Sequence, residues 1–134
     1  MTWLLDTNAI IRLLNGRSES LRQRLLAADP EDLATCAVVK AELRFGAARS
    51  RDPAATRAQQ DSLLSQLVSL PFDDAAAEVY GELRARLQAA GTPIGPTDYL
   101  IAAIAVANDV VLVTHNTAEC GPVPGLKVED WESP

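Results

Sequence analysis

The sequence predicts a single α/β domain in which helices cover both faces of a mostly parallel sheet of about five strands. Short apolar runs alternate along the chain with longer segments of helical period, which is the pattern of βαβ units. The 134 residues contain no internal repeat and no linker that would divide them, and 48% are hydrophobic. We therefore expect one domain over residues 1–134, with a two- or three-layer core spanning about residues 3–131.

The first strand is expected at residues 3–5, where a short apolar run ends in Asp6. Thr7 and Asn8 are both good N-cap residues, so we expect them to cap a helix over residues 8–14. Ligands of open α/β sheets bind outside the carboxyl ends of the strands, so Asp6 lies where chemistry is usually found. The alternative is that Asp6 is itself the helix cap.

The remaining elements are predicted from helical spacing of apolar residues and from short apolar runs. Helical spacing predicts further helices at residues 20–28, 38–49, 60–70, 73–90 and 98–107. Apolar runs predict further strands at residues 33–37, 67–72, 110–113 and 126–128. Residues 50–57 are charged and contain a proline, which predicts a mobile connection. After Trp131 we expect a frayed tail.

Several features of the sequence indicate the cellular location of the protein. Cys36 and Cys120 form no metal-binding pattern, and the amino terminus lacks the features of a signal peptide, so we expect a cytoplasmic protein. The longest uncharged apolar run, residues 99–107, is shorter than the roughly 18 residues that span a bilayer.

The net charge of −6 argues at first against a nucleic-acid partner. The charge is unevenly distributed, because residues 1–57 hold nine Lys or Arg against seven acids and residues 58–134 hold three against eleven. The uneven distribution therefore does not exclude a basic face formed by the first half of the chain. Metal ions bound to carboxylates would also offset part of the negative charge.

Four side chains should converge on one edge of the sheet. Asp6 and Asn116 follow predicted strands, Glu42 lies about one turn into the helix after the second strand, and Asp98 opens a helix after a Pro-Gly-Pro loop. Two carboxylates about 4 Å apart repel by roughly 4 kcal/mol at an effective dielectric of about 20, so a proton or a cation must offset them. One or two Mg²⁺ ions would do so and would support phosphodiester hydrolysis.

Each acid also has an ordinary structural interpretation. Glu42 could be a solvated residue paired with Arg44 or Arg49, and Asp98 could be a helix cap.

Together with their neighbours these residues resemble the PIN-domain ribonucleases, and most closely the VapC-type toxins of bacterial type II toxin–antitoxin pairs. The resemblance runs from about residue 3 to residue 131 in the family's order and spacing. The motifs that carry it are Leu5-Asp6-Thr7-Asn8, Lys40-Ala41-Glu42-Leu43, the loop from Gly91 to Asp98 leading into Ile101-Ala102-Ala103, Val113-Thr114-His115-Asn116, and the closing segment from Val123 to Trp131.

The resemblance implies an α/β/α domain, usually a homodimer, with Mg²⁺- or Mn²⁺-dependent endoribonuclease activity. It also implies a cognate antitoxin protein that blocks the site, and an RNA substrate such as a tRNA. Asp6, Glu42 and Asp98 match the family's acids and would be metal ligands.

The fourth catalytic position, usually an aspartate, is Asn116 here. An amide can still orient a metal-bound water but adds no charge, and Glu119 could substitute for the acid through water. Thr7 and Thr114 would give polar support, and Asn8 would orient Asp6.

Two other functions stay open. The asparagine at position 116, in place of the usual aspartate, could mark a weak or inactive nuclease that acts by binding RNA or its antitoxin. An aspartyl phosphotransferase using Asp6 as nucleophile is less well supported, because Asn8 stands where a related phosphatase has a second aspartate.

Several surface residues could contribute to binding. His115 is interpreted as a strand-end surface residue, and Trp131 as packing over the sheet edge. Candidate RNA contacts are Arg12, Arg17, Arg44, Arg49 and Arg51. Four leucines could form an exposed groove for a helix of a partner protein, although we expect them to pack in the core. They are Leu21, Leu63, Leu64 and Leu67.

Overall fold

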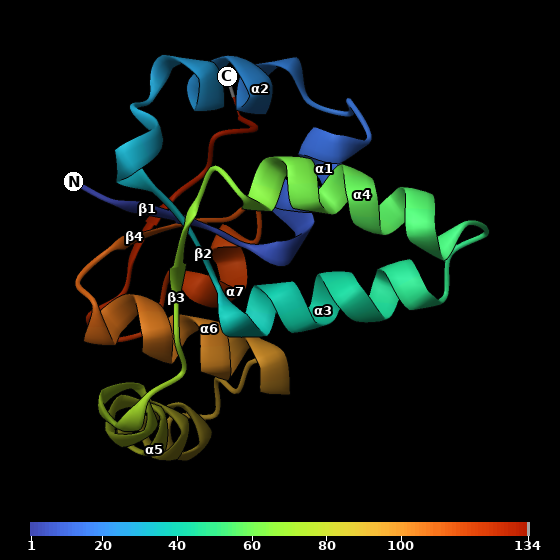
Figure 1. Ribbon diagram of the computed structural model, residues 1–134. Helices are drawn as coiled ribbons and strands as arrows, with labels where there is room; N and C mark the ends of the chain where they lie inside the picture. The colour runs from blue at the N-terminus through green and yellow to red at the C-terminus, as the bar shows by residue number, and fades with distance from the viewer. Residues whose placement is uncertain (134) are drawn as a thin grey trace.

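The computed structural model describes residues 1–133 and contains one five-stranded, all-parallel sheet (Figure 1). The strand order is β3-β2-β1-β4-β5. The strands are β1 (Trp3–Leu5), β2 (Leu33–Cys36), β3 (Val68–Leu70), β4 (Val111–Val113) and β5 (Lys127–Glu129). The predicted parallel sheet of about five strands is confirmed.

Helices cover both faces of this sheet. They are α1 (Thr7–Leu14), α2 (Glu19–Ala27), α3 (Ala37–Ala48), α4 (Pro53–Leu64), α5 (Asp74–Ala89), α6 (Pro96–Ala107) and α7 (Thr117–Cys120), with a 3₁₀ turn η1 at Pro30–Asp32. Applied to this strand order, the rule of right-handed crossovers predicts α1 to α4 on one face and α5 to α7 on the other. Figure 1 shows α1, α2 and α4 on one side of the sheet, and α5 and α6 on the opposite side. The fold is the predicted three-layer α/β/α arrangement.

The chain reverses its direction of travel across the sheet at β1. It moves outward from β1 through β2 to β3, and then returns to add β4 and β5 on the other side of β1. Leu5 of β1 pairs with Val113 of β4, so both strands end at the same level. The crevice between β1 and β4 is therefore a topological switch point, the place where open α/β sheets bind ligands.

The central strands and the helix α6 form the core. Leu4, Leu5 and Leu112 are fully or almost fully buried, because a parallel sheet between two helical layers has no solvated face. The alanine-rich helix α6 is buried from Ile101 to Ala105 and lies against α5. Small side chains allow this close approach. Within residues 1–133, no helix combines the length and the apolar character needed to cross a bilayer.

Two local predictions are wrong. Asp6, and not Thr7 or Asn8, is the N-cap of α1, since its side chain accepts a hydrogen bond from the backbone N–H of Ala9. Residues 53–57 are not a mobile connection but the first turn of α4, which Asp52 caps and Pro53 opens. We interpreted the proline as a residue that interrupts helices, although proline is favoured in the first turn of a helix.

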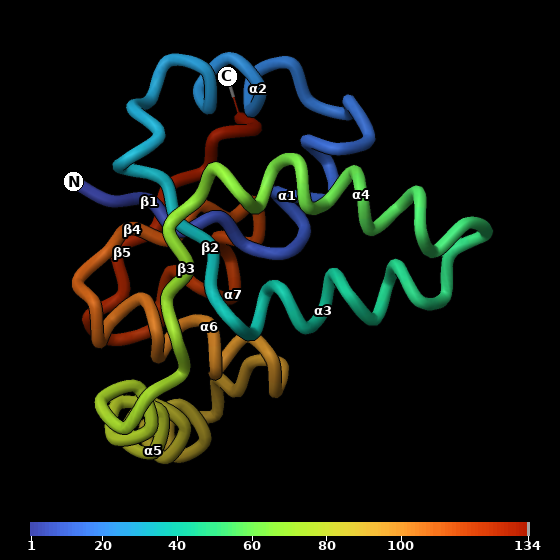
Figure 2. Tube along the Cα trace, viewed as in Figure 1, coloured from blue at the N-terminus to red at the C-terminus, as the bar shows by residue number. Residues whose placement is uncertain are grey.

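The segment that follows β5 packs against the rest of the domain as far as Trp131. Trp131 is 2% exposed, and its ring lies 5.7 Å from that of Trp3. The Trp131 carbonyl accepts a hydrogen bond from Ser20 on α2, and Figure 2 shows this end of the chain beside α2. Trp131 thus packs over the edge of the sheet, as the sequence predicted.

Replacing Trp131 with alanine should lower the free energy of unfolding by about 3–5 kcal/mol, because a buried indole leaves a cavity that neighbours fill only in part. Urea denaturation measures the loss. The control is Phe45→Ala, since Phe45 is 63% exposed and its removal should change stability by about 0.5 kcal/mol or less. Equal losses for the two variants would contradict the packing described for Trp131.

Candidate functional site

Three of the predicted acids line one cavity at the carboxyl edge of the sheet. The cavity has a volume of about 230 Å³ and is lined by Asp6, Thr7, Asn8, Glu42, Thr97, Asp98 and Ile101. Its acids come from the end of β1, from α3 and from the start of α6. Among residues 1–133, no lysine, arginine or histidine lines it.

Asp6 is held by both strands of the switch point. Its backbone N–H donates to the Val113 carbonyl at 3.1 Å, and its carboxylate Oδ1 accepts from the Ala9 N–H at 2.7 Å. Burial raises the pKa of Asp6, against the opposing effect of hydrogen bonds from Thr114 and Ala9. The Thr114 hydroxyl in turn accepts from the backbone N–H of Asn116, so β4 also supports Asp6.

Glu42 reaches the cavity from the second turn of α3. Its Oε1 accepts a hydrogen bond from the Thr7 hydroxyl at 2.5 Å. Thr7 is the first residue of α1, after the Asp6 cap, and its hydroxyl proton is directed to Glu42. The interaction ties the glutamate to the first turn of α1, which explains how a long side chain is aimed at the edge of the sheet.

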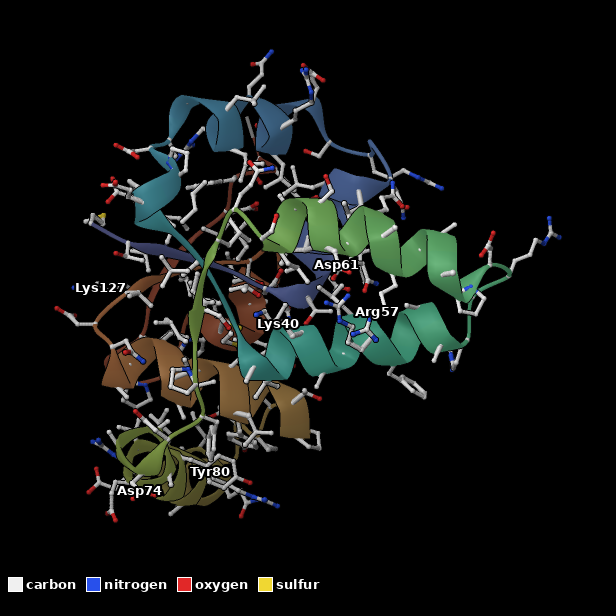
Figure 3. All side chains as sticks on the ribbon, in the orientation of Figure 1. Lys40, Arg57, Asp61, Asp74, Tyr80 and Lys127 are labelled. Carbon is white, nitrogen blue, oxygen red and sulfur yellow. The ribbon has the colours of Figure 1, made fainter. Side chains whose placement is uncertain are left out.

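The alternative partners considered for Glu42 have other contacts. Arg44 pairs with Asp61 on α4 at 2.5 Å, and Asp61 is labelled in Figure 3. The Arg49 guanidinium lies 4.9 Å from the centre of the Phe45 ring. Within residues 1–133, neither arginine forms an ion pair with Glu42.

Asp98 lies in the first turn of α6 but is not its cap. The N-cap is Gly95, and Asp98 stands three residues later. A Cβ atom at Gly95 would lie 3.1 Å from the Asp98 carboxylate, so the glycine leaves room for that side chain. Burial raises the pKa of Asp98, and the nearby charges of Glu119, Glu42 and Asp6 raise it further.

The donor set of this cavity suits a hard divalent cation. All three acids offer oxygen ligands, and the mutual repulsion that raises the pKa of Asp98 is the electrostatic condition that a cation would relieve. The three carboxylates do not all approach to within 4.8 Å of one another, because the only such group among residues 1–133 is His115, Asp130 and Glu132. An Mg²⁺ ion that keeps several waters binds directly through only one or two carboxylates, so it does not require all three within that distance.

Asn116 lies beside the acidic cavity rather than in its lining. It is the N-cap residue of α7, and its amide nitrogen donates to Glu119 at 2.9 Å. It lines a neighbouring cavity of about 380 Å³ that also includes Asp6. Since Glu119 raises the pKa of Asp98, the negative charge on this side comes from Glu119, and the neutral Asn116 holds it in place.

Sequence reasoning missed Glu132. Its charge contributes to the raised pKa of Asp6, and its carboxylate accepts a hydrogen bond from Arg12. No motif marks this residue, which directly follows the buried Trp131.

The leucine set considered as a partner groove is largely internal. Leu21 is fully buried and Leu64 is 5% exposed, so core packing holds for these two. Leu63 and Leu67 line a shallow cavity between the α2 region and α4.

Comparison with known proteins places the chain in a family. The family model described as PIN domain matches residues 3–118 of the chain. The match covers both β1, which carries Asp6, and the start of α6, which carries Asp98.

Two curated relatives and one solved structure resemble nearly the whole chain. The tRNA(fMet)-specific endonuclease VapC of Salmonella typhimurium is 34% identical and Ribonuclease VapC2 of Rickettsia felis is 35% identical; the alignments cover 98% of this chain and 98% and 99% of those proteins. The structure of DNA-bound VapBC from Salmonella typhimurium superposes with a TM-score of 0.92 at 34% identity, covering 98% of each chain. The chain belongs to the VapC ribonucleases of the PIN-domain family.

Replacing Asp98 with asparagine should stabilise the metal-free protein at neutral pH. The folded-state pKa of Asp98 is raised, so its ionised form opposes folding, and wild-type protein regains that stability as the pH falls through the raised pKa. We expect a Tm about 3 °C higher for Asp98→Asn at pH 7. Thermal melts from pH 7 to pH 4 should show the difference narrowing. A constant difference across this range would contradict the electrostatic cause.

Replacing Thr7 with valine should release Glu42 and weaken Mn²⁺ binding by about tenfold, because it removes a partner that orients a ligand. Isothermal titration calorimetry measures the affinity. The control is Thr56→Val on α4, which lies outside the acidic cavity. An unchanged affinity in Thr7→Val would show that Glu42 needs no such support.

Proposed function

We propose that this VapC ribonuclease is a metal-dependent endoribonuclease toxin that hydrolyses RNA phosphodiester bonds at the cavity of Asp6, Glu42 and Asp98. The observation that supports the proposal best is the meeting of three carboxylates from distant parts of the chain in one cavity. No basic side chain of residues 1–133 lines that cavity to neutralise them. Mg²⁺ is the expected ion and Mn²⁺ the alternative.

A bound divalent ion would supply a water of lowered pKa and would offset charge growing on the phosphate. The chain's own residues prepare the place for it. Asp6 is fixed by the β1–β4 pairing and by the α1 N-terminus, and Thr7 orients Glu42. Asn116 holds Glu119 near Asp98, which favours a role for this pair in orienting water rather than in direct ligation.

RNA is the substrate class that the family membership supports. The Salmonella relative is named for tRNA(fMet), so a tRNA is the first substrate to test. The acidic net charge of −6 is compatible with RNA binding, because bound cations would reduce the repulsion at the site.

We also propose a cognate antitoxin that covers the acidic cavity, since the Salmonella neighbour was solved as VapBC bound to DNA. A homodimer and a cytoplasmic location complete the proposal.

One observation favours a second candidate function. A neutral amide stands at Asn116, where the family usually has an aspartate, so the protein could bind RNA or the antitoxin with little cleavage. The phosphotransferase hypothesis is dropped, because the chain belongs to a ribonuclease family.

Asp6→Asn, Glu42→Gln and Asp98→Asn should each reduce RNA cleavage by at least about 10²-fold, because each removes a charge that holds the cation. Gel assays of purified tRNA in millimolar Mg²⁺ measure cleavage. EDTA should abolish wild-type activity, and Mn²⁺ should restore it. The matched control is Glu78→Gln, on the exposed surface of α5.

Wild-type protein that binds the RNA without cutting it in either metal would favour the second candidate function. Full activity in Asp6→Asn and Asp98→Asn would overturn the proposed site.

A further inference from the structure

A second cavity adjoins the acidic one. It has a volume of about 380 Å³ and is lined by Asp6, Asn8, Arg12, His115, Asn116 and Glu132. Asp6 and Asn8 line both cavities, so the two lie next to each other where β1 ends and α1 begins. A chain-like substrate held at the acidic cavity would extend into this one.

Arg12 gives this second cavity a positively charged side chain, which the first cavity lacks. Among residues 1–133, it is the one lysine or arginine that lines either cavity. Arg12 lies one helical turn after Asn8 on α1, and its side chain is 48% exposed, so a ligand can reach it.

Glu132 fixes the position of the Arg12 side chain. The Arg12 Nε–H donates to a Glu132 carboxylate oxygen, and the Glu132 side chain is only 8% exposed. The backbone N–H of Glu132 donates to Asp130 at 2.9 Å, and the neighbouring Trp131 is buried. A guanidinium carries five N–H donors, so the bond to Glu132 leaves the terminal amino groups for another acceptor.

Two of the acids at this second cavity already have partners. His115, Asp130 and Glu132 have ligand atoms within 4.8 Å of one another, but Asp130 pairs with His115 and Glu132 with Arg12. The exposed part of Arg12 is suited to an oxyanion such as a phosphate.

We propose that Arg12 binds an RNA phosphate next to the scissile one, and that Glu132 is the positioning residue that keeps the guanidinium away from Asp6. This inference rests on the proposed function. Among residues 1–133, Arg12 is the one lysine or arginine that lines a cavity together with Asp6, so without Glu132 a pairing of Arg12 with the Asp6 carboxylate would compete with the metal ion. Glu132 therefore serves metal binding indirectly, whereas Arg12 serves RNA binding directly.

The test compares Arg12→Gln with Arg22→Gln. Arg22 is also an exposed arginine paired with a glutamate, but it lines neither cavity. We expect Arg12→Gln to raise the KM for RNA about tenfold with little change in kcat. In the non-cleaving Asp98→Asn background, the slope of log affinity against log salt should fall by about 0.7 in magnitude, the loss of one phosphate contact. Arg22→Gln should change neither quantity.

A second experiment tests the role of Glu132 with the variant Glu132→Gln. We expect about tenfold weaker Mn²⁺ binding by calorimetry, and recovery of that affinity in the double variant Arg12→Gln/Glu132→Gln. A merely structural role for Glu132 would give no such recovery and would overturn the positioning role.

If wild-type protein cuts RNA while Arg12→Gln behaves like Arg22→Gln, the phosphate site is wrong and the proposed function stands. If wild-type protein cuts no RNA in Mg²⁺ or Mn²⁺, the proposed function fails, and this inference fails with it.

Discussion

The hydrogen bonds of Asp6 are the constraint on which both the fold and the site depend. Its backbone completes the β1–β4 pairing, and its carboxylate caps α1. One residue therefore sets the angle at which α1 leaves the sheet and places an acid at the switch point. The next residue, Thr7, donates its hydroxyl to Glu42 and so connects α1 to α3. The ordinary role of a helix cap and the proposed role in catalysis are thus compatible in the same side chain.

The acidic cavity is an unfavourable feature that the rest of the domain tolerates. Burial and neighbouring acids raise the pKa of both Asp6 and Asp98, so the ionised form of each carboxylate is less favourable in the metal-free fold than in water. The same surroundings raise the pKa of the buried Cys120 thiol to about 11, which leaves it unreactive at neutral pH. Functional sites commonly oppose stability in this way. The well-packed layers around β1 and α6 supply the stability that the cavity lacks.

The sequence allowed the sheet, the layers and the three acids to be predicted, because periodicity and strand ends report directly on burial and edge position. It misplaced the cap of α1, since Asp, Thr and Asn are all good caps and only the geometry selects among them. The first turn of α4 was missed because Pro53 was interpreted as a breaker. Glu132 and its contact with Arg12 could not be predicted, because the two residues are 120 positions apart and no local pattern links them.

The strand order has a consequence for how the protein acquires activity. The sheet contains no hairpin, and the central strand β1 cannot be paired on both sides until β4, more than a hundred residues later, has docked. Such non-local pairing makes folding slow relative to proteins with local contacts. The acids themselves span residues 6 to 98, so a chain that has not folded as far as α6 cannot assemble them. Any potentially harmful activity is thereby confined to the last stage of folding.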